Sequence, residues 1–249
     1  MRQITFFKIS SIFLMSLFGK AILYADVISE IDSLSQVLKN APKEKKPVLY
    51  NRIAWKYRNS NPEKSYQLAM SGLKLSRLLN NTSQFAFSHN VLGVYHAYQN
   101  NHDSALYYFK NQIDFSEKNS LADFEAYAYQ NIGNMYYRMA LFDAALENYL
   151  STEKEYQRIG SMSNLAKAKT NIGLVYFEKG NYSKALNYYH EAQELFRDST
   201  AGKEGLGALL NNMGDVLFEL LDYDKALNYY EESIVINKEQ IDFRRLCTS

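Results

Sequence analysis

The sequence contains few side chains that could carry out chemistry. None of its four histidines stands in a His-x-x-x-His or His-Glu-x-x-His pattern, the spacing that places two metal ligands on one helical turn. The single cysteine, Cys247, has no histidine near it in sequence, so neither a cysteine zinc site nor an activated thiol is predicted. We interpret the histidines as packing or turn residues: His89, His96, His102 and His190. We therefore expect no metal, no cofactor and no enzyme.

A glycine-rich stretch at 202–207 is the other feature that could suggest chemistry. A phosphate-binding loop needs a preceding strand and a Gly-Lys-Ser or Gly-Lys-Thr order, and this stretch reads GKEGLG. We interpret it as a loop between two repeats.

Asparagine is the polar residue whose recurrence suggests a binding surface. Asn131, Asn171 and Asn212 each stand two residues before a glycine, and Asn134 and Asn211 lie close by. An amide side chain has donors and an acceptor, which suits the backbone of an extended peptide. The alternative is structural, since an amide beside a close helix crossing can bond the backbone of a neighbouring helix. The sequence leaves both interpretations open.

Larger side chains could anchor such a ligand. Lys167 stands four residues before Asn171, so one helical turn places both on the same face. Aromatic and arginine side chains carry much of the binding energy at interfaces. The candidates of this kind are Arg52, Trp55, Tyr127 and Tyr137. Rings at these positions could instead belong to the core.

The elements that must position these residues form a repeat. Its glycines, which are about 40 residues apart, are Gly93, Gly133, Gly173 and Gly214. An alanine follows each glycine twelve residues later, and an aromatic ring comes four residues after that; the alanines are Ala105, Ala145, Ala185 and Ala226. Apolar residues at helical spacing flank a polar stretch, which predicts a helix–turn–helix hairpin. Glycine within a helix costs about 1 kcal/mol relative to alanine, so we expect the partner helix to cross closest there, opposite the alanine.

The repeat divides the chain into segments. A degraded unit precedes four regular ones, giving five repeats over 47–240, with approximate bounds of 47–82, 83–120, 121–161, 162–201 and 202–240. An amphipathic segment with Val27, Ile31, Leu34 and Leu38 on one face makes 26–46 a predicted N-terminal capping helix and linker. Residues 241–249 read as the start of an incomplete sixth repeat, so we expect a fragment or a frayed last hairpin.

These motifs resemble the tetratricopeptide repeat. The shared pattern is Ile172, Gly173, Tyr176, Ala185, Tyr189 and Ala192, and the resemblance covers roughly residues 47 to 240. The long period is similar to a variant of the family with extended helices. The resemblance implies an all-α fold, a right-handed α-solenoid of helix-turn-helix hairpins with a concave groove. It also implies that the asparagines two residues before the glycine, Asn131, Asn171 and Asn212, contact the backbone or terminal carboxylate of a bound peptide. Lys167 with Asn171 matches the spacing of the family's carboxylate clamp, although no second basic residue follows in register.

The N-terminal segment indicates export. Arg2 and Lys8 precede an apolar run at 9–19 that is too short to span a bilayer comfortably, and Ala25 is a small residue suited to cleavage. An uncleaved membrane anchor is the alternative, and both place the body of the protein on the periplasmic or cell-envelope side. With 28 Lys and Arg against 27 Asp and Glu, the chain does not suggest a nucleic-acid partner.

The sequence therefore predicts an exported, non-catalytic scaffold of tetratricopeptide-like repeats that binds a peptide or protein partner in its groove. The alternative is the sensory input region of a membrane-bound signalling protein, a histidine kinase or a transcription regulator. An exported cap followed by repeats is similar in arrangement to the extracytoplasmic parts of bacterial sensor kinases and regulators. A membrane is expected as a partner only through an uncleaved signal or a missing C-terminal region.

Overall fold

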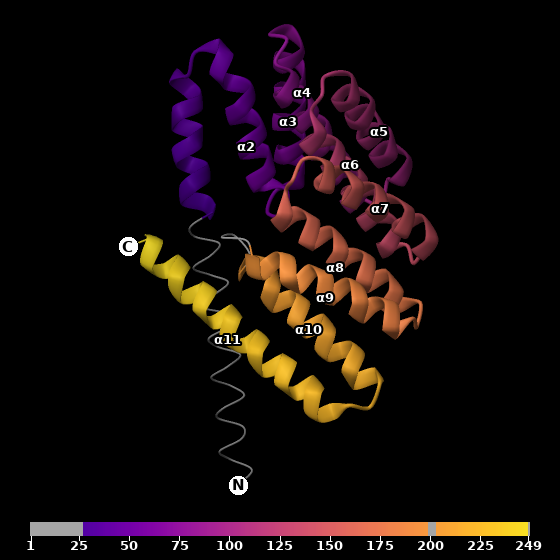
Figure 1. Cartoon of the computed structure of the whole chain (residues 1–249). Coiled ribbons are helices and arrows are strands. Elements are labelled where there is room, and N and C mark those ends of the chain that lie inside the picture. The colour runs from indigo at the N-terminus through magenta and orange to yellow at the C-terminus, as the bar shows by residue number, and fades with distance from the viewer. Residues whose placement is uncertain (1–26, 199–202, 249) are drawn as a thin grey trace. The chain divides into compact units, whose positions relative to one another are not determined.

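The structure, a computed structural model, describes residues 27–198 and 203–248. Its regular structure is helical, with no strand in these ranges, which confirms the predicted all-α class. A helix over 27–40 comes first, and the remaining elements (Figure 1) are η1 (Lys43–Lys45), α2 (Lys46–Tyr57), α3 (Pro62–Leu78), α4 (Thr82–Tyr98), α5 (His102–Lys118), α6 (Ala122–Arg138), α7 (Phe142–Arg158), α8 (Met162–Glu178), α9 (Tyr182–Asp198), α10 (Lys203–Glu219) and α11 (Tyr223–Thr248). The predicted signal at 1–25 lies outside the described residues.

The chain divides into two compact units, residues 1–99 and 100–249. The first contains the helices up to α4, and the second contains α5 to α11. Within the second unit each helix packs against the next, most extensively α6 on α7, α8 on α9 and α10 on α11. In the first unit α2 and α3 form a comparable pair. These pairs are the predicted helix–turn–helix hairpins.

The joints between helices share one backbone geometry. Each helix from α3 to α10 is 17 residues long. A residue with positive φ follows most of them: Asn80, Asn100, Ser120, Ala140, Gly160, Gly180 and Leu221. The next N–H bonds the carbonyl five residues earlier, as from Ser161 to Tyr156 at 3.0 Å, which is a Schellman motif. The structural period is therefore a helix and its turn, half the repeat seen in the sequence.

In the first unit the helix over 27–40 covers α2. Its Ile31 and Leu34 are buried against Leu49 and Ile53, and Leu68 of α3 packs on the same cluster. A chain of hydrogen bonds joins α2 to α4 through the buried Asn51. Its amide nitrogen donates to the backbone oxygen of Gln84 at 2.8 Å, and its amide oxygen accepts from the Ser88 hydroxyl at 2.8 Å. This amide therefore has the structural role that the sequence left open for asparagines.

The second unit shows why glycine recurs at one position. A Cβ at Gly133 would lie 2.7 Å from the ring of Tyr149, and one at Gly214 would lie 2.5 Å from the ring of Tyr230. The nearest atoms at Gly173 likewise belong to the ring of Tyr189. The expectation that alanine faces glycine is correct only in part: the aromatic ring of the second helix lies nearest, and at Gly173 the backbone oxygen of Ala185 lies beside it, 3.2 Å from the position of a Cβ. The alanines Ala105, Ala145, Ala185 and Ala226 are themselves buried, and Gly93 is buried within α4.

Two features near the C-terminal end differ from expectation. The stretch at 202–207 is not a loop throughout, because α10 begins at Lys203 and includes Gly205 and Gly207. A Cβ at Gly205 would collide with the ring of Phe196, and one at Gly207 with the side chain of Asn237, so close packing accounts for both glycines. In addition, α11 continues to Thr248 as one helix, across the residues read as the start of another repeat.

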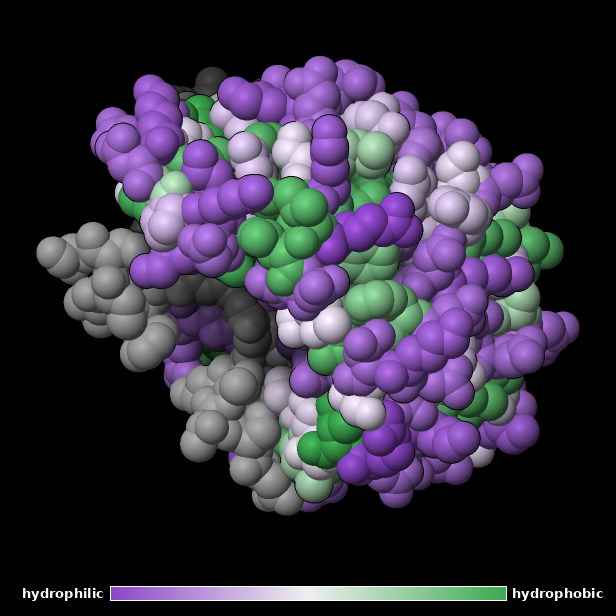
Figure 2. All heavy atoms as spheres, turned by 90° about the horizontal axis from the view of Figure 1, so that it is seen from above, coloured by the Kyte–Doolittle hydropathy of each residue, from purple (hydrophilic) through white to green (hydrophobic). Residues whose placement is uncertain are grey.

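The surface of the described residues is mostly polar. On the face shown in Figure 2, hydrophilic side chains prevail and hydrophobic ones form small, separate patches. Scattered apolar residues of this kind are usual on protein surfaces and do not by themselves mark an interface.

Candidate functional site

The predicted groove residues of the second unit lie on the first helices of its hairpins, α6, α8 and α10. Tyr137 of α6 donates its hydroxyl hydrogen to Glu178 of α8 at 2.7 Å, and α8 also contacts α10. We call the surface formed by these three helices the first-helix face. Its predicted residues are Tyr127, Asn131, Asn134 and Tyr137 on α6, Lys167 and Asn171 on α8, and Asn211 and Asn212 on α10.

The other side of α8 packs against second helices. Lys169, which is largely buried, forms ion pairs with Glu153 of α7 and Glu191 of α9. This triad holds three helices together and leaves the side with Lys167 and Asn171 for the first-helix face.

Three predicted asparagines on this face, Asn134, Asn171 and Asn212, differ in whether another side chain already bonds their amide. Asn134 accepts a hydrogen bond from the Tyr149 hydroxyl at 2.8 Å, so this amide supports its own hairpin. By contrast Asn171 and Asn212, both half-buried, make no hydrogen bond with any described residue. An amide that is partly withdrawn from water and has no partner keeps its donors and acceptor available to a ligand.

The remaining predicted residues on this face are partly accessible. Asn211 is exposed and Lys167 is half-buried, and neither forms a hydrogen bond or ion pair within the described ranges. Asn131 is half-buried. The side chain of Tyr127 is 41% exposed and its ring meets Tyr156 edge-on, with centroids 6.1 Å apart. Burial raises the pKa of the Tyr137 hydroxyl, and the hydrogen bond to Glu178 raises it further, so this phenol stays a hydrogen-bond donor.

The two predicted N-terminal anchors belong to the first unit, whereas the helices of the first-helix face belong to the second. Arg52 is exposed and lies 3.8 Å from Glu30. Trp55 is half-buried, with its ring 6.1 Å from that of Phe87 and with the guanidinium of Arg58 4.2 Å above it. These contacts explain both residues as parts of the local packing of the first unit.

Sequence reasoning missed the tyrosine hydroxyls that reach the first-helix face. In two repeats, the residue after the glycine accepts a hydrogen bond from the tyrosine sixteen residues after that glycine. Tyr149 donates to Asn134, and Tyr230 donates to Asp215 at 2.8 Å. The corresponding position in α8 is Leu174, which has no acceptor, and the buried Tyr189 hydroxyl has no hydrogen-bond partner in the described structure. Reading the position after the glycine across the repeats would have revealed this difference.

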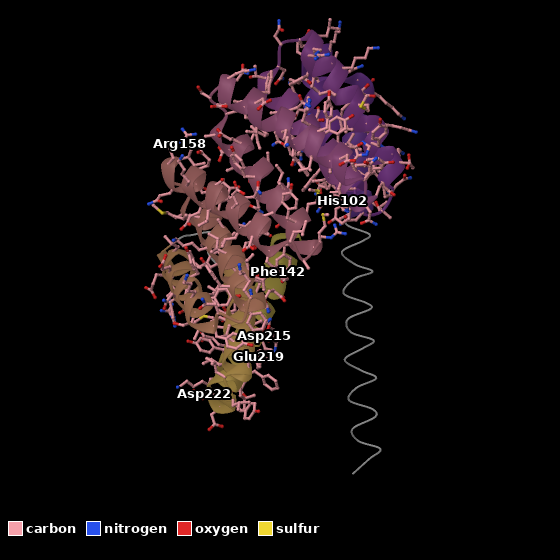
Figure 3. The ribbon with its side chains drawn as sticks, turned by 90° about the vertical axis from the view of Figure 1, so that its right-hand side faces the viewer. His102, Phe142, Arg158, Asp215, Glu219 and Asp222 are labelled. Atoms are coloured by element: carbon pink, nitrogen blue, oxygen red, sulfur yellow. The ribbon has the colours of Figure 1, made fainter. Side chains whose placement is uncertain are left out.

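The same comparison reveals carboxylates that the sequence analysis did not single out. Glu178 of α8 and Asp215 and Glu219 of α10 are exposed, and no cation of the described residues pairs with them. Figure 3 shows Asp215 and Glu219 following one another toward the end of α10, with Asp222 beyond it. Asp222 differs from them because Lys225 ion-pairs with it at 2.6 Å.

Within the described ranges, no group of three or more His, Cys, Asp or Glu side chains could hold a metal ion. Nor does any helix there combine the length and apolar character needed to cross a membrane.

Comparison with known proteins identifies the repeat. The family model described as tetratricopeptide repeat matches residues 164–239, from α8 into α11. This part of the chain belongs to the tetratricopeptide repeat family. The sequence has no match among curated proteins.

Solved structures share its fold at low identity. BtubC (BKLC) from P. vanneervenii is 17% identical with a TM-score of 0.70, and the match covers 86% of this chain and 92% of BtubC. A Rap protein complexed with Competence and Sporulation Factor is 15% identical with a TM-score of 0.59, covering 89% of this chain and 73% of that one. The Rap conjugation gene regulator of plasmid pLS20, in complex with the Phr* peptide, is 21% identical with a TM-score of 0.62, covering 79% and 53%.

Proposed function

We propose that this tetratricopeptide repeat protein is a scaffold that binds a peptide or a peptide-like segment of a protein on its first-helix face. The observation that carries the proposal is the pair of half-buried amides, Asn171 and Asn212, at equivalent positions of successive repeats and without partners in the described residues. Equivalent amides spaced along neighbouring helices match the repeating donors and acceptors of an extended backbone. Two proteins of similar fold, both Rap proteins, were solved with Competence and Sporulation Factor or the Phr* peptide.

The proposed scaffold has no chemistry of its own. Affinity would come from several shallow contacts: amides for the ligand backbone, Lys167 for an acceptor group, and the exposed ring of Tyr127 as an apolar anchor. Each of these contacts is weak by itself, so the affinity for a ligand depends on how many of them it makes at once.

Selection from a random peptide library tests the function. We expect the purified chain to retain a set of peptides, and the double variant Asn171→Ala with Asn212→Ala to weaken their binding about thirtyfold, since each of the two lost hydrogen bonds contributes roughly 1 kcal/mol. The matched control is Asn187→Ala with Asn228→Ala, which removes two exposed amides from second helices. Equal weakening by both pairs, or no retained peptide, would contradict the proposal.

We also propose that the protein is exported, on the basis of the basic residues, the short apolar run and the small residue Ala25 at its N-terminus. N-terminal sequencing of the protein recovered from the producing bacterium tests this. A first residue of Asp26 in an envelope fraction is expected, and an intact Met1 in the cytoplasmic fraction would contradict export.

A further inference from the structure

The C-terminal end of the first-helix face carries three carboxylates that form no ion pair with a cation of the described residues. Glu178 stands at the end of α8, and Asp215 and Glu219 are one turn apart near the end of α10, so the last two share a face. Neighbouring lysines are engaged elsewhere, since Lys179 ion-pairs with Asp143 and Lys225 with Asp222. The three carboxylates therefore leave an uncompensated negative charge on two adjacent helices.

Tyrosine hydroxyls position two of these carboxylates. Tyr137 donates to Glu178 at 2.7 Å, and Tyr230 donates to Asp215 at 2.8 Å. The hydrogen bond to Asp215 contributes, after burial, to raising the pKa of Tyr230 to about 12. An ionised carboxylate has about four lone-pair sites, so each one accepts this bond and can still accept others. The acids are thus held in place without being neutralised.

A buried, unsatisfied hydroxyl lies among the same groups. Tyr189 is 0% exposed, and its hydroxyl has no hydrogen-bond partner in the described residues. The ring of Tyr189 packs on Gly173 of α8, the helix that ends at Glu178, and the equivalent hydroxyl of Tyr230 reaches Asp215. Burial raises the pKa of the Tyr189 hydroxyl, and the charges of Asp215 and Glu178 raise it further. A buried polar group without a partner is rare and costly in proteins. The unsatisfied hydroxyl is therefore a second, independent sign that the site is completed by a ligand.

Aromatic rings lie beside the acids. Phe218, between Asp215 and Glu219 on α10, is 52% exposed, and its ring lies edge-on to the 54% exposed Tyr223, with centroids 5.3 Å apart. An exposed aromatic face attracts cations, and it does so more strongly where carboxylates already draw them in.

The charge of the whole unit favours the same kind of ligand. Residues 100–249 contain 15 Lys and Arg against 22 Asp and Glu, so their net charge is 15 − 22 = −7. The net charge of the whole chain is nevertheless +1, because residues 1–99 contain 13 Lys and Arg against 5 Asp and Glu and contribute 13 − 5 = +8. A negative potential of this kind steers cationic ligands toward the second unit.

We propose that the site formed by Glu178, Asp215 and Glu219 binds a cationic side chain, arginine or lysine, of the peptide held on the first-helix face. This inference rests on the proposed peptide-binding function and adds the chemical class of the ligand. Guanidinium suits the site well, because its several N–H donors lie in a fixed plane and can serve more than one carboxylate and the Tyr189 oxygen. An ammonium has three donors and fits with less geometric precision.

Sequencing the library-selected peptides gives the first test. Enrichment of arginine or lysine over the starting library supports the inference. Retained peptides without this enrichment would overturn it and leave the peptide-binding function intact, whereas a library that yields no binder would overturn both.

Matched peptides and variants give the second test. The probes are three capped peptides of glycine, serine and tyrosine that carry two arginines, two lysines or two citrullines, measured by isothermal titration. We expect the arginine peptide to bind about tenfold more tightly than its neutral citrulline counterpart. The variant Asp215→Asn with Glu219→Gln should remove this preference, while Glu231→Gln with Glu232→Gln, which lowers the charge equally on α11, should keep it. Equal affinity for arginine and citrulline, or loss of preference in both double variants, would overturn the proposal.

Tyr189→Phe supplies a test that is independent of charge. Removing the unsatisfied hydroxyl should not impair folding, yet it should weaken the arginine peptide about threefold or more. An unchanged affinity in this variant would show that the hydroxyl takes no part in the site.

Discussion

The tyrosines that cross the repeat glycines provide a direct test of the hydrogen bonding in the second unit. Tyr149 and Tyr189 occupy equivalent positions and are both buried, but only the Tyr149 hydroxyl has an acceptor, Asn134 at 2.8 Å. Replacing each by phenylalanine removes one oxygen from the same environment. The two substitutions should nevertheless change the free energy of unfolding in opposite directions.

The magnitudes follow from the hydrogen bonds. Tyr149→Phe loses a neutral hydrogen bond, which contributes about 1 kcal/mol to stability. Tyr189→Phe removes a buried hydroxyl whose desolvation is uncompensated, at a cost of roughly 1–3 kcal/mol, so this variant should be more stable than the parent by about 1 kcal/mol. The expected difference between the two variants is about 2 kcal/mol.

Urea unfolding followed by circular dichroism measures this difference as a shift of the midpoint at constant slope. A companion variant, Leu174→Asn, introduces the missing acceptor. It should be less destabilising in the parent than in the Tyr189→Phe background, by a coupling of about 1 kcal/mol. Equal losses for Tyr149→Phe and Tyr189→Phe, or a coupling near zero, would refute the assignment of partners.

Three further predictions concern stability. His89 is buried, and desolvation, followed by the charge of Arg77, lowers its pKa to about 4. The stability that depends on its neutral form is therefore complete above pH 6.5 and falls as the pH drops toward 4. Denaturant titrations should show a loss of about 2 kcal/mol in the free energy of unfolding between pH 7.5 and 5, and this loss should be absent in His89→Gln. Ala140 has a φ of 56°, and Gly180 has a φ of 70° with open space where a Cβ would lie, so Ala140→Gly should raise, and Gly180→Ala lower, the free energy of unfolding by about 1 kcal/mol in the same assay. Gly173→Ala should cost about 1–3 kcal/mol because its methyl group collides with the Tyr189 ring, and a melting temperature equal to the parent's would contradict that packing.

Much of the fold could be predicted from three residue types at fixed spacing. The glycine and the aromatic residue recur together because the ring packs directly on the backbone of the facing helix, where a Cβ would collide with it, as at Gly133 and Tyr149. The shorter period of one helix and its turn could not be predicted, because the positive-φ residues are chemically mixed and include Ala140 and Leu221. The glycines at 202–207 misled for a related reason, since glycine serves equally in loops and beside a bulky neighbour such as Phe196.

The site was predicted less completely than the fold. Position in the repeat located the asparagines on the first helices, but their roles depend on which hydroxyl reaches them. Asn134, one residue after Gly133, accepts a hydrogen bond from Tyr149, whereas Asn171, two residues before Gly173, has no partner in the described residues. The acidic cluster escaped notice because charge was summed over the whole chain, where the basic first ninety-nine residues offset it.

The uniform joints between helices have a consequence for how such a chain can change its length. Removing residues 142–181 would connect Leu141 directly to Tyr182 and re-create a turn of the same type, because the segment begins and ends at equivalent points. The shortened chain would lose α7 and α8 and pair α6 with α9, so that Tyr189 would take the place of Tyr149 opposite Gly133. The extent of the ligand surface can therefore evolve in discrete steps, while the chemistry of each step is tuned by single residues such as the one after the glycine.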